Sequence, residues 1–426
     1  MPQAEPAATQ DPLHQPYLLV TNIPCYVDAQ GTAYLDRSWH HDFVEHLNYL
    51  PQLRIACPSL KLDSTQHGLD LMPVQDQAHR FIQLKPQTTL LKAALTLPQT
   101  AWTLVRAVNE ARIVHSSVAG WPYPLGWIAS ALARMKGRPL VVIVESAPWR
   151  ASDVSERRRL SQRVRGVVYE HLAKWSCRQA DLALFTQPSY QQQLHQRARG
   201  QSYVTPATWI RDEFLLDAKA AEAAWQKRCQ TGPRLLFAGR LAHEKGVHTL
   251  LQALDLLESQ HVELTVDFVG EGSCADAIDQ RTASLTHVCV QRLKPRSYGA
   301  TFFSLLDAYH AVLVPSLSDE QPRIIFDAAA RALGAIASST DGLRSLIQDG
   351  VTGQLVPPGD PDALAAAMRE LAQATGRARS WGVAALEQAR PHTHTAMHER
   401  RAELLRDMCQ SLMRAPTPPQ VRPAAT

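Results

Sequence analysis

Short apolar runs separated by segments of helical periodicity are the feature that most constrains the fold of this chain. Residues 139–144 (PLVVIV) are apolar throughout, as in a strand buried on both faces of a sheet. Similar runs recur in the first half of the chain, at residues 17–21, 53–57, 112–115, 182–186 and 202–205. Strands that alternate with helices predict parallel βαβ units and a doubly wound sheet.

The same pattern starts again near residue 232. The strand candidates of the second half are residues 234–237, 263–269, 287–290, 311–314, 335–338 and 353–356. Two α/β domains of similar size predict a ligand in the cleft between them, at the carboxyl ends of the strands. The predicted divisions are a disordered tail over 1–16, an N-terminal domain over 17–216, a linker over 217–231, a C-terminal domain over 232–378, helices over 379–410 that pack back toward the N-terminal domain, and a second disordered tail over 411–426.

Composition excludes several classes of protein. The 426 residues carry a net charge of only +4, which argues against a nucleic-acid binder, and the positive surplus lies in the first half. The seven cysteines are dispersed with no CxxC pair, so neither a disulfide framework nor a zinc site is predicted. The first residues have no signal-peptide pattern and no apolar run is long enough to span a bilayer, so we expect a cytoplasmic protein.

Two glycine-containing turns follow strands of the second half. In GRLAHEKG, Gly239 permits close approach of a ligand, and the cations Arg240 and Lys245 precede a helix, an arrangement suited to a diphosphate. In VGEG, Gly270 and Gly272 can hold backbone near a nucleotide. A tight turn with two solvated cations, and a plain turn, are the alternatives.

A polar loop with two spaced carboxylates follows a third strand. Asp319 lies on the loop and Asp327 in the first turns of the next helix, so both can face one cleft, one toward a sugar hydroxyl and the other toward a ribose. In the alternative interpretation, Asp319 or Glu320 only caps the helix.

The order of these motifs resembles the C-terminal half of family 4 retaining glycosyltransferases, which have the GT-B fold: two Rossmann-like doubly wound parallel-sheet domains that face a central cleft. The segment DGVTGQLVPPGDPDAL is similar to the family's following region. The resemblance is dense from about residue 232 to 375 and rests mainly on element order before that. It is specific to the family but not to a substrate.

Carried over by this resemblance, Arg240 and Lys245 bind the donor diphosphate, Asp319 contacts the donor sugar, and all three are the expected catalytic residues. Asp327 binds the ribose. The other expected donor-binding residues are Gly239, Gly270, Gly272, Arg292, Leu293, Glu320, Gln321, Pro322, Arg323 and Ile324. Both family glutamates are aspartates here, and Asp319 is preferred to Glu320 as the first carboxylate because Pro322 then falls in register.

The first half is expected to bind the acceptor. Gly31 follows the first strand and could approach the donor phosphates, His115 follows another strand, and Glu145 ends the PLVVIV strand, where it could orient an acceptor hydroxyl. Ordinary polar termination of a strand is the alternative for His115 and Glu145.

The segment from Arg150 to Arg178 combines many cations with an apolar stripe at helical spacing, which predicts either an amphipathic helix on an anionic membrane or a solvated helix face. The expected partners are a nucleotide sugar, a saccharide or lipid-linked acceptor, and this membrane surface.

The implied reaction is transfer of a sugar from a nucleotide diphosphate sugar to an acceptor hydroxyl with retention of configuration, in surface polysaccharide or glycolipid synthesis. No DxD-type motif is placed to hold the diphosphate, so metal-independent catalysis with no cofactor is expected. A sugar-nucleotide epimerase, a non-catalytic scaffold and a membrane-surface adaptor remain as alternatives.

Overall fold

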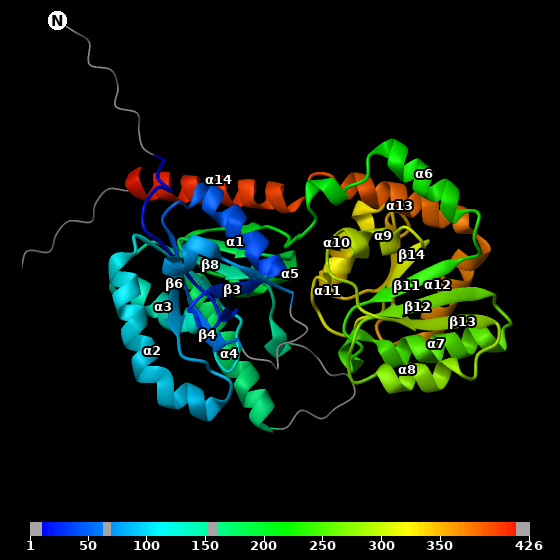
Figure 1. The fold of residues 1–426 in the computed structure, drawn as a ribbon, viewed down its shortest axis with the longest axis horizontal. Coiled ribbons are helices and arrows are strands. Elements are labelled where there is room, and N and C mark those ends of the chain that lie inside the picture. The colour runs from blue at the N-terminus through cyan, green and yellow to red at the C-terminus, as the bar shows by residue number, and fades with distance from the viewer. Residues whose placement is uncertain (1–10, 63–69, 151–159, 415–426) are drawn as a thin grey trace, which may run out of the picture.

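The computed structural model describes residues 11–62, 70–150 and 160–414, which form two α/β domains joined side by side (Figure 1). Each domain has its own sheet, and helices cover both sheets. The two doubly wound domains expected from the sequence are therefore confirmed. The remaining residues lie outside the described part of the chain.

The N-terminal sheet has the strand order β10-β9-β8-β7-β1-β4-β2-β3-β5, and β6 pairs with β4. Its strands are β1 (Tyr17–Val20), β2 (Cys25–Val27), β3 (Ala33–Asp36), β4 (Leu53–Lys61), β5 (Leu71–Pro73), β6 (Phe81–Leu84), β7 (Ile113–Ser117), β8 (Leu140–Val144), β9 (Leu182–Phe185) and β10 (Gln201–Val204). The part from β10 to β4 is parallel, as predicted, whereas β3 runs antiparallel to both β2 and β5.

The helices of this domain connect the strands. They are α1 (Arg37–Tyr49), α2 (Leu90–Glu110), α3 (Leu125–Met135), α4 (Leu160–Gln179) and α5 (Pro188–Leu194). Helix α1 begins where it does because the Asp36 carboxylate accepts hydrogen bonds from the backbone N–H groups of Ser38 and Trp39. Trp39 and Phe43 then bury the inner face of α1 against the sheet.

The C-terminal sheet is wholly parallel, with the order β13-β12-β11-β14-β15-β16. Its strands are β11 (Arg234–Ala238), β12 (Leu264–Val269), β13 (Val288–Leu293), β14 (Ala311–Val314), β15 (Gly334–Ser338) and β16 (Gly353–Val356). The helices around it are α6 (Ala218–Arg228), α7 (Val247–Ser259), α8 (Ala275–Thr282), α9 (Ala300–Leu306), α10 (Arg323–Ala330), α11 (Asp341–Arg344), α12 (Pro361–Gln373) and α13 (Thr375–Ala389). The order reverses at β11 and β14, whose carboxyl ends form the switch point where ligands of such sheets bind.

Residues 217–231, expected to be a linker, instead contain helix α6, which packs on the C-terminal domain. Trp225 is buried in that domain's core, and its indole N–H donates to the backbone oxygen of Ala332 at 3.0 Å. Ile210 and Phe214 belong to the same core, so the C-terminal domain begins before residue 216. The linker assignment is wrong because Ala221 and Trp225 give this alanine-rich segment a face that is buried in the C-terminal core.

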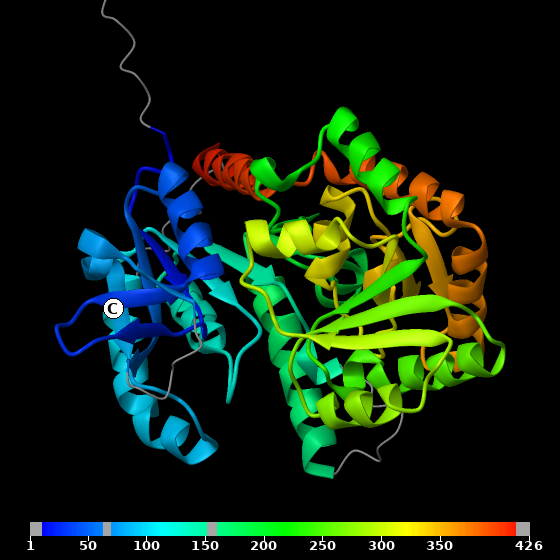
Figure 2. The same ribbon diagram turned by 45° about the vertical axis from the view of Figure 1, so that its right-hand side comes forward.

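Helix α14 (His394–Arg414) crosses back to the N-terminal domain, where Ala402, Leu405 and Met408 join the core under the sheet (Figure 2). Helix α13 stays on the C-terminal domain, where Trp381 is buried. Of the helices expected over 379–410 to pack back, only α14 does so, and it continues to Arg414. Residues 11–16 are also placed, and Leu13 is fully buried, so the ordered chain begins earlier than predicted.

Candidate functional site

A cavity of about 780 Å³ lies in the C-terminal domain at the carboxyl ends of β11, β12 and β14. It is the switch point of this sheet, and all three polar loops singled out in the sequence reach it. The residues that line it are Phe237, Ala238, Gly239, Arg240, Lys245, Val269, Gly270, Glu271, Pro295, Arg296, Tyr298, Phe302, Leu313, Val314, Ser316, Glu320, Gln321, Pro322, Arg323, Ile324 and Asp327. This set, the donor-side pocket, contains most of the expected donor-binding residues.

The GRLAHEKG loop is held in place by its second glycine, Gly246. Gly246 has φ +75°, and a Cβ there would lie 1.8 Å from the backbone oxygen of Pro315, so the β11 and β14 loops touch at a point where only glycine fits. Gly270 likewise lies against the backbone oxygen of Gly239. The loops that carry Arg240, Lys245 and Ser316 are thus fixed relative to one another by close backbone contacts.

The two cations of this loop differ in their surroundings. Arg240 is exposed and pairs with Glu244 at 3.1 Å. Lys245 is mostly buried, and its ammonium group pairs with Glu320 across the pocket. Desolvation lowers the pKa of Lys245 to about 8, with the Arg240 charge adding to the effect, so the ammonium form prevails below that pH.

The side chains of the adjacent residues Asp319 and Glu320 have different partners. The Asp319 carboxylate accepts from the backbone N–H of Gly342 at 2.7 Å and from the Gln187 side-chain amide at 3.3 Å, so it ties the loop to α11 and to the N-terminal domain. Burial raises its pKa. The carboxylate that reaches the donor-side pocket is Glu320, so the preference for Asp319 over Glu320 finds no support in this geometry.

Asp327 lies behind the pocket, where it is almost completely buried. Its carboxylate accepts a hydrogen bond of 2.7 Å from the Tyr298 hydroxyl, and burial raises its pKa to about 6. The Arg323 guanidinium lies over the rings of Tyr298 and Trp209, 5.4 Å from each centroid. Tyr298 lines the pocket, whereas Trp209 does not line it but lies against Arg323, and sequence reasoning missed both.

Gly272, Arg292 and Leu293 do not line the pocket. Gly272 packs against the backbone of Leu241, and Arg292 pairs with Asp279 on the outer face. The loop that follows β13 does line it, through Pro295 and Arg296. The cavity therefore meets this segment of the chain a few residues beyond Arg292 and Leu293.

Residues 232–374 match the family model described as "Glycosyl transferases group 1". The C-terminal domain is therefore similar to group 1 glycosyl transferases, over about a third of the chain.

The curated relatives match over the same region. Glycogen synthase of Mycobacterium tuberculosis (strain ATCC 25618 / H37Rv) is 31% identical over 159 residues, which cover 36% of this chain and 38% of the relative. D-inositol 3-phosphate glycosyltransferase of Corynebacterium urealyticum is 28% identical over 196 residues, 44% of each protein. The chain therefore spans less than half the length of these relatives.

Solved structures resemble the whole fold. Sucrose-phosphate synthase from Thermosynechococcus elongatus superposes with a TM-score of 0.66 at 16% identity, over 93% of this chain and all of that one. HepE of Anabaena in complex with UDP gives 0.63 at 17% identity, over 92% of this chain and all of that one. At these identities the likeness concerns the fold, which is GT-B.

The N-terminal domain has its own cavity of about 270 Å³, lined by residues at the carboxyl ends of β1, β7 and β8. His115 and Glu145, the expected acceptor-side residues, both line it, and Trp39 of α1 and Arg401 of α14 complete it. Gly31 does not. It lies at the turn between β2 and β3, with φ +85° and open space around it, because the loop expected after the first strand instead forms a hairpin.

A cluster of imidazoles surrounds Asp42 behind this second cavity. The ring nitrogens of His398, His394 and His46 lie 3.0, 3.2 and 3.2 Å from its carboxylate oxygens. Asp42, His46 and His398 could hold a metal ion, which the sequence analysis did not foresee although the HHDFVEH and HTHTAMH segments carry the signal. Hydrogen bonds already satisfy both oxygens, and they hold the pKa of Asp42 well below its usual range despite burial.

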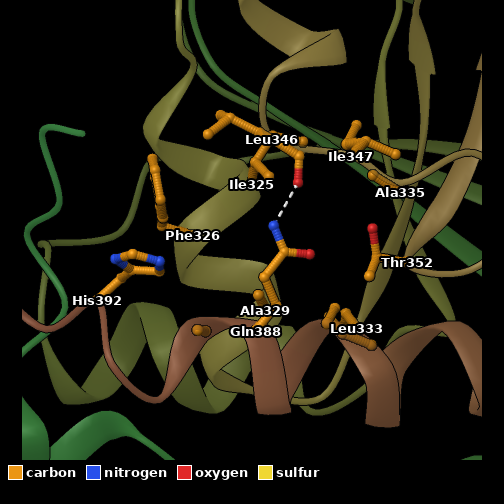
Figure 3. Close-up of a pocket in the computed structure, with 12 residues that line it drawn as sticks. Ile325, Phe326, Ala329, Leu333, Ala335, Leu346, Ile347, Thr352, Gln388 and His392 are labelled. Atoms are coloured by element: carbon orange, nitrogen blue, oxygen red, sulfur yellow. Dashed lines mark hydrogen bonds between the residues drawn. The ribbon is translucent and has the colours of Figure 1, made fainter. Parts of the chain in front are cut away.

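A third hollow is part of the core. It holds only about 30 Å³ among apolar side chains between α10 and α13, and the Gln388 amide that borders it donates to the Leu346 oxygen at 2.9 Å (Figure 3). The space suffices for about one water molecule, so it is a packing void and not a binding site.

Proposed function

We propose that the protein transfers a sugar from a nucleoside diphosphate sugar to an acceptor hydroxyl. The observation that carries this proposal is the convergence of Arg240, Lys245 and buried Asp327 on one 780 Å³ cavity at the switch point of the sheet. Cations and helix N-termini suit a diphosphate, and a buried carboxylate suits a ribose diol. The solved complex of HepE with UDP makes a uridine nucleotide the first candidate.

Breaking the anomeric bond places negative charge on the departing diphosphate. Lys245 is charged and largely desolvated, so it can stabilise that charge, and Arg240 can fork two phosphate oxygens. Lys245 pairs with Glu320, and a bound diphosphate would take over that pairing. Because two side-chain cations supply the positive charge, we propose that catalysis needs no metal ion.

Retention of configuration rests on the resemblance to family 4 enzymes. In the proposed step, the acceptor oxygen attacks the anomeric carbon on the face that the diphosphate leaves, and a donor phosphate oxygen takes the acceptor's proton. Contacts across the domain boundary, from Gln187 and Tyr190 to Asp319, hold the two halves together and would limit entry of water.

The test is thermal-shift binding of UDP, GDP, ADP and their sugars, followed by turnover with the sugar nucleotide that binds. Lys245→Ala should abolish the shift and lower turnover more than tenfold. Lys227→Ala, which removes an exposed lysine on α6, is the matched control and should leave both unchanged. Sugar isomerisation without an acceptor would indicate an epimerase. Absence of any shift in the wild type would favour a non-catalytic scaffold.

We further propose that the N-terminal domain rests on an anionic membrane, as a peripheral enzyme on the cytoplasmic face in surface polysaccharide or glycolipid synthesis. The first turns of α2 and α4 project at the same end of this domain (Figures 1 and 2). They expose large apolar side chains together with cations. The apolar residues are Leu90, Leu91, Leu95, Val164, Val167 and Val168, and the cations are Lys92, Arg163 and Arg165.

This surface shares the start of α4 with the expected segment between Arg150 and Arg178, and α2 adds to it. Residues 151–159 of that segment lie outside the described residues, and Arg150 and Lys174 pair with Glu170. Among the helices of the described ranges, none has the length and apolar character to cross a bilayer. Flotation with phosphatidylglycerol vesicles should recover the protein, and Leu91→Asp with Val167→Asp should abolish recovery. Equal recovery of the double variant would contradict the proposal.

A further inference from the structure

The cavity of the N-terminal domain contains a buried arginine that lacks a counter-ion. Arg401, which α14 supplies, is only 4% exposed. Its Nε has no hydrogen-bond partner, and within the described ranges its side chain forms neither a hydrogen bond nor an ion pair. A buried cation without a partner is costly, so natural proteins rarely keep one unless a ligand completes it.

The two carboxylates near Arg401 do not fill that role. Asp42 is occupied by three imidazoles. Glu145 lines the cavity, and its loss of contact with solvent there raises its pKa more than the Arg401 charge lowers it. Glu145 and Arg401 therefore line one cavity without forming an ion pair.

Two further donors line the same cavity, and neither has a hydrogen-bond partner among the described residues. The Trp39 indole N–H is buried and unbonded, and so is Nε2 of His115. The Tyr17 hydroxyl lies 3.0 Å from Nδ1 of His115, and burial raises the pKa of Tyr17, so the hydroxyl stays protonated and can donate to Nδ1. That assignment places the ring proton on Nε2, and burial lowers the pKa of His115 to about 3, so the ring is neutral.

Three N–H donors with free valences thus line a cavity of about 270 Å³. Donors without matching acceptors suit an oxyanion, and a guanidinium binds phosphate or carboxylate oxygens in pairs. Glu145 adds an acceptor for a hydroxyl group. The volume accommodates a group of about the size of one sugar residue.

Hydrogen bonds link the wall of this cavity to the wall of the donor-side pocket. The backbone oxygen of Glu145 accepts from the Thr186 hydroxyl at 3.1 Å, and the next residue, Gln187, reaches Asp319 at 3.3 Å. Asp319 precedes Glu320, which lines the donor-side pocket. A molecule in this cavity would therefore lie on the side of the cleft from which an acceptor approaches the donor.

We propose that this cavity binds an acceptor that carries an oxyanion, a phosphate or a carboxylate, and that Arg401 is the residue that selects it. The inference rests on the proposed glycosyl transfer, and it specifies the acceptor class. It makes Arg401 a specificity-determining residue contributed by the helix that crosses between the domains.

The test is isothermal titration calorimetry of the full-length chain with glucose 6-phosphate, glucuronate, inorganic phosphate and glucose. Glucose 6-phosphate and glucuronate should bind, and glucose should not. A preference for one of the two sugar anions identifies the oxyanion as phosphate or carboxylate. Binding of inorganic phosphate alone would contradict recognition of a sugar. Arg401→Met should weaken binding of the preferred sugar anion about tenfold or more. The matched control is Arg400→Met, because Arg400 is the exposed neighbour on α14, paired with Glu403, and should bind as the wild type does.

Arg401→Lys keeps the charge but not the fork, so it should bind the sugar anion more weakly than the wild type and more tightly than Arg401→Met. If Arg401→Met does not fold, Arg401→Lys takes its place as the test variant. Equal affinity for glucose and glucose 6-phosphate, or equal losses in Arg400→Met and Arg401→Met, would overturn the inference. Binding of UDP, GDP and ADP, measured on the same samples, separates the two proposals. If the wild type binds one of these nucleotides but no sugar anion, only the acceptor class is refuted. If the wild type binds none of the three nucleotides, the donor assignment is refuted.

Discussion

Replacing Gly246 by alanine tests whether the two loops of the donor-side pocket must touch. The φ of +75° alone costs alanine about 1–2 kcal/mol. The new Cβ would lie 1.8 Å from the Pro315 oxygen, and reaching the 3.0 Å of real contacts moves two main-chain segments apart by more than 1 Å. That shift breaks the hydrogen bonds to the Glu244 oxygen from the Leu317 N–H at 2.9 Å and the Ser316 hydroxyl at 3.3 Å, worth about 1 kcal/mol each.

Together these contributions predict a loss of about 3–4 kcal/mol, which for a domain of this size lowers the melting temperature by roughly 6–16 °C. Because Lys245 and Ser316 flank the contact, affinity for UDP should fall more than tenfold as well. Circular dichroism melts with and without UDP measure both effects.

Gly350→Ala is the matched control. Gly350 has the same φ of +75° but no atom within 4 Å of an added Cβ, so it isolates the conformational cost of about 1–2 kcal/mol and should leave UDP binding intact. If Gly246→Ala is no more destabilising than Gly350→Ala and binds UDP normally, the close contact of the two loops does not position the pocket.

Two further predictions concern the same domain. Because the pKa of Asp327 is raised to about 6 from an ordinary 3.8, its contribution to stability is complete below pH 3.8 and is lost as the pH rises through 6. Asp327→Asn should therefore raise the free energy of unfolding by about 2–3 kcal/mol at pH 8 and leave it unchanged near pH 3, as measured in thermal melts at both pH values. It should also weaken UDP binding. An unchanged free energy of unfolding at pH 8 would contradict the argument from burial. Trp225→Ala should cost about 3–5 kcal/mol and Trp225→Phe about 1 kcal/mol in urea unfolding, whereas a linker position would tolerate both within 0.5 kcal/mol.

The parallel strands were predictable because each is encoded locally. A run such as 139–144 is apolar at every position, which only a strand covered on both faces requires, and it became β8. The strands of the second half were found in the same way. Once strands and helices alternate, the polar loops at their carboxyl ends must gather at one edge, so Arg240, Lys245 and Asp327 could be assigned to one pocket.

The antiparallel extension of the N-terminal sheet was not predictable by the same rule. Strands β2 and β5 are three residues long and half-exposed, so they carry no clear periodicity. Their pairing depends on the nine-residue length of β4, which extends past the parallel core and offers β2 an edge. Gly31 therefore lies in a hairpin turn that the sequence alone presents as a loop beside the donor.

By itself, the sequence determined the number of domains, the direction of most strands and the loops that meet at the donor-side pocket, because apolar periodicity and turn residues act over a few neighbours. Only the tertiary structure decided which of two adjacent carboxylates, Asp319 or Glu320, reaches Lys245, because that choice depends on the Gly342 and Gln187 partners that turn Asp319 away. It also decided that Arg401 of α14 would lie in a cavity with His115 and Trp39. Such a meeting of distant segments depends on how the chain returns across both domains, and no local pattern records that path.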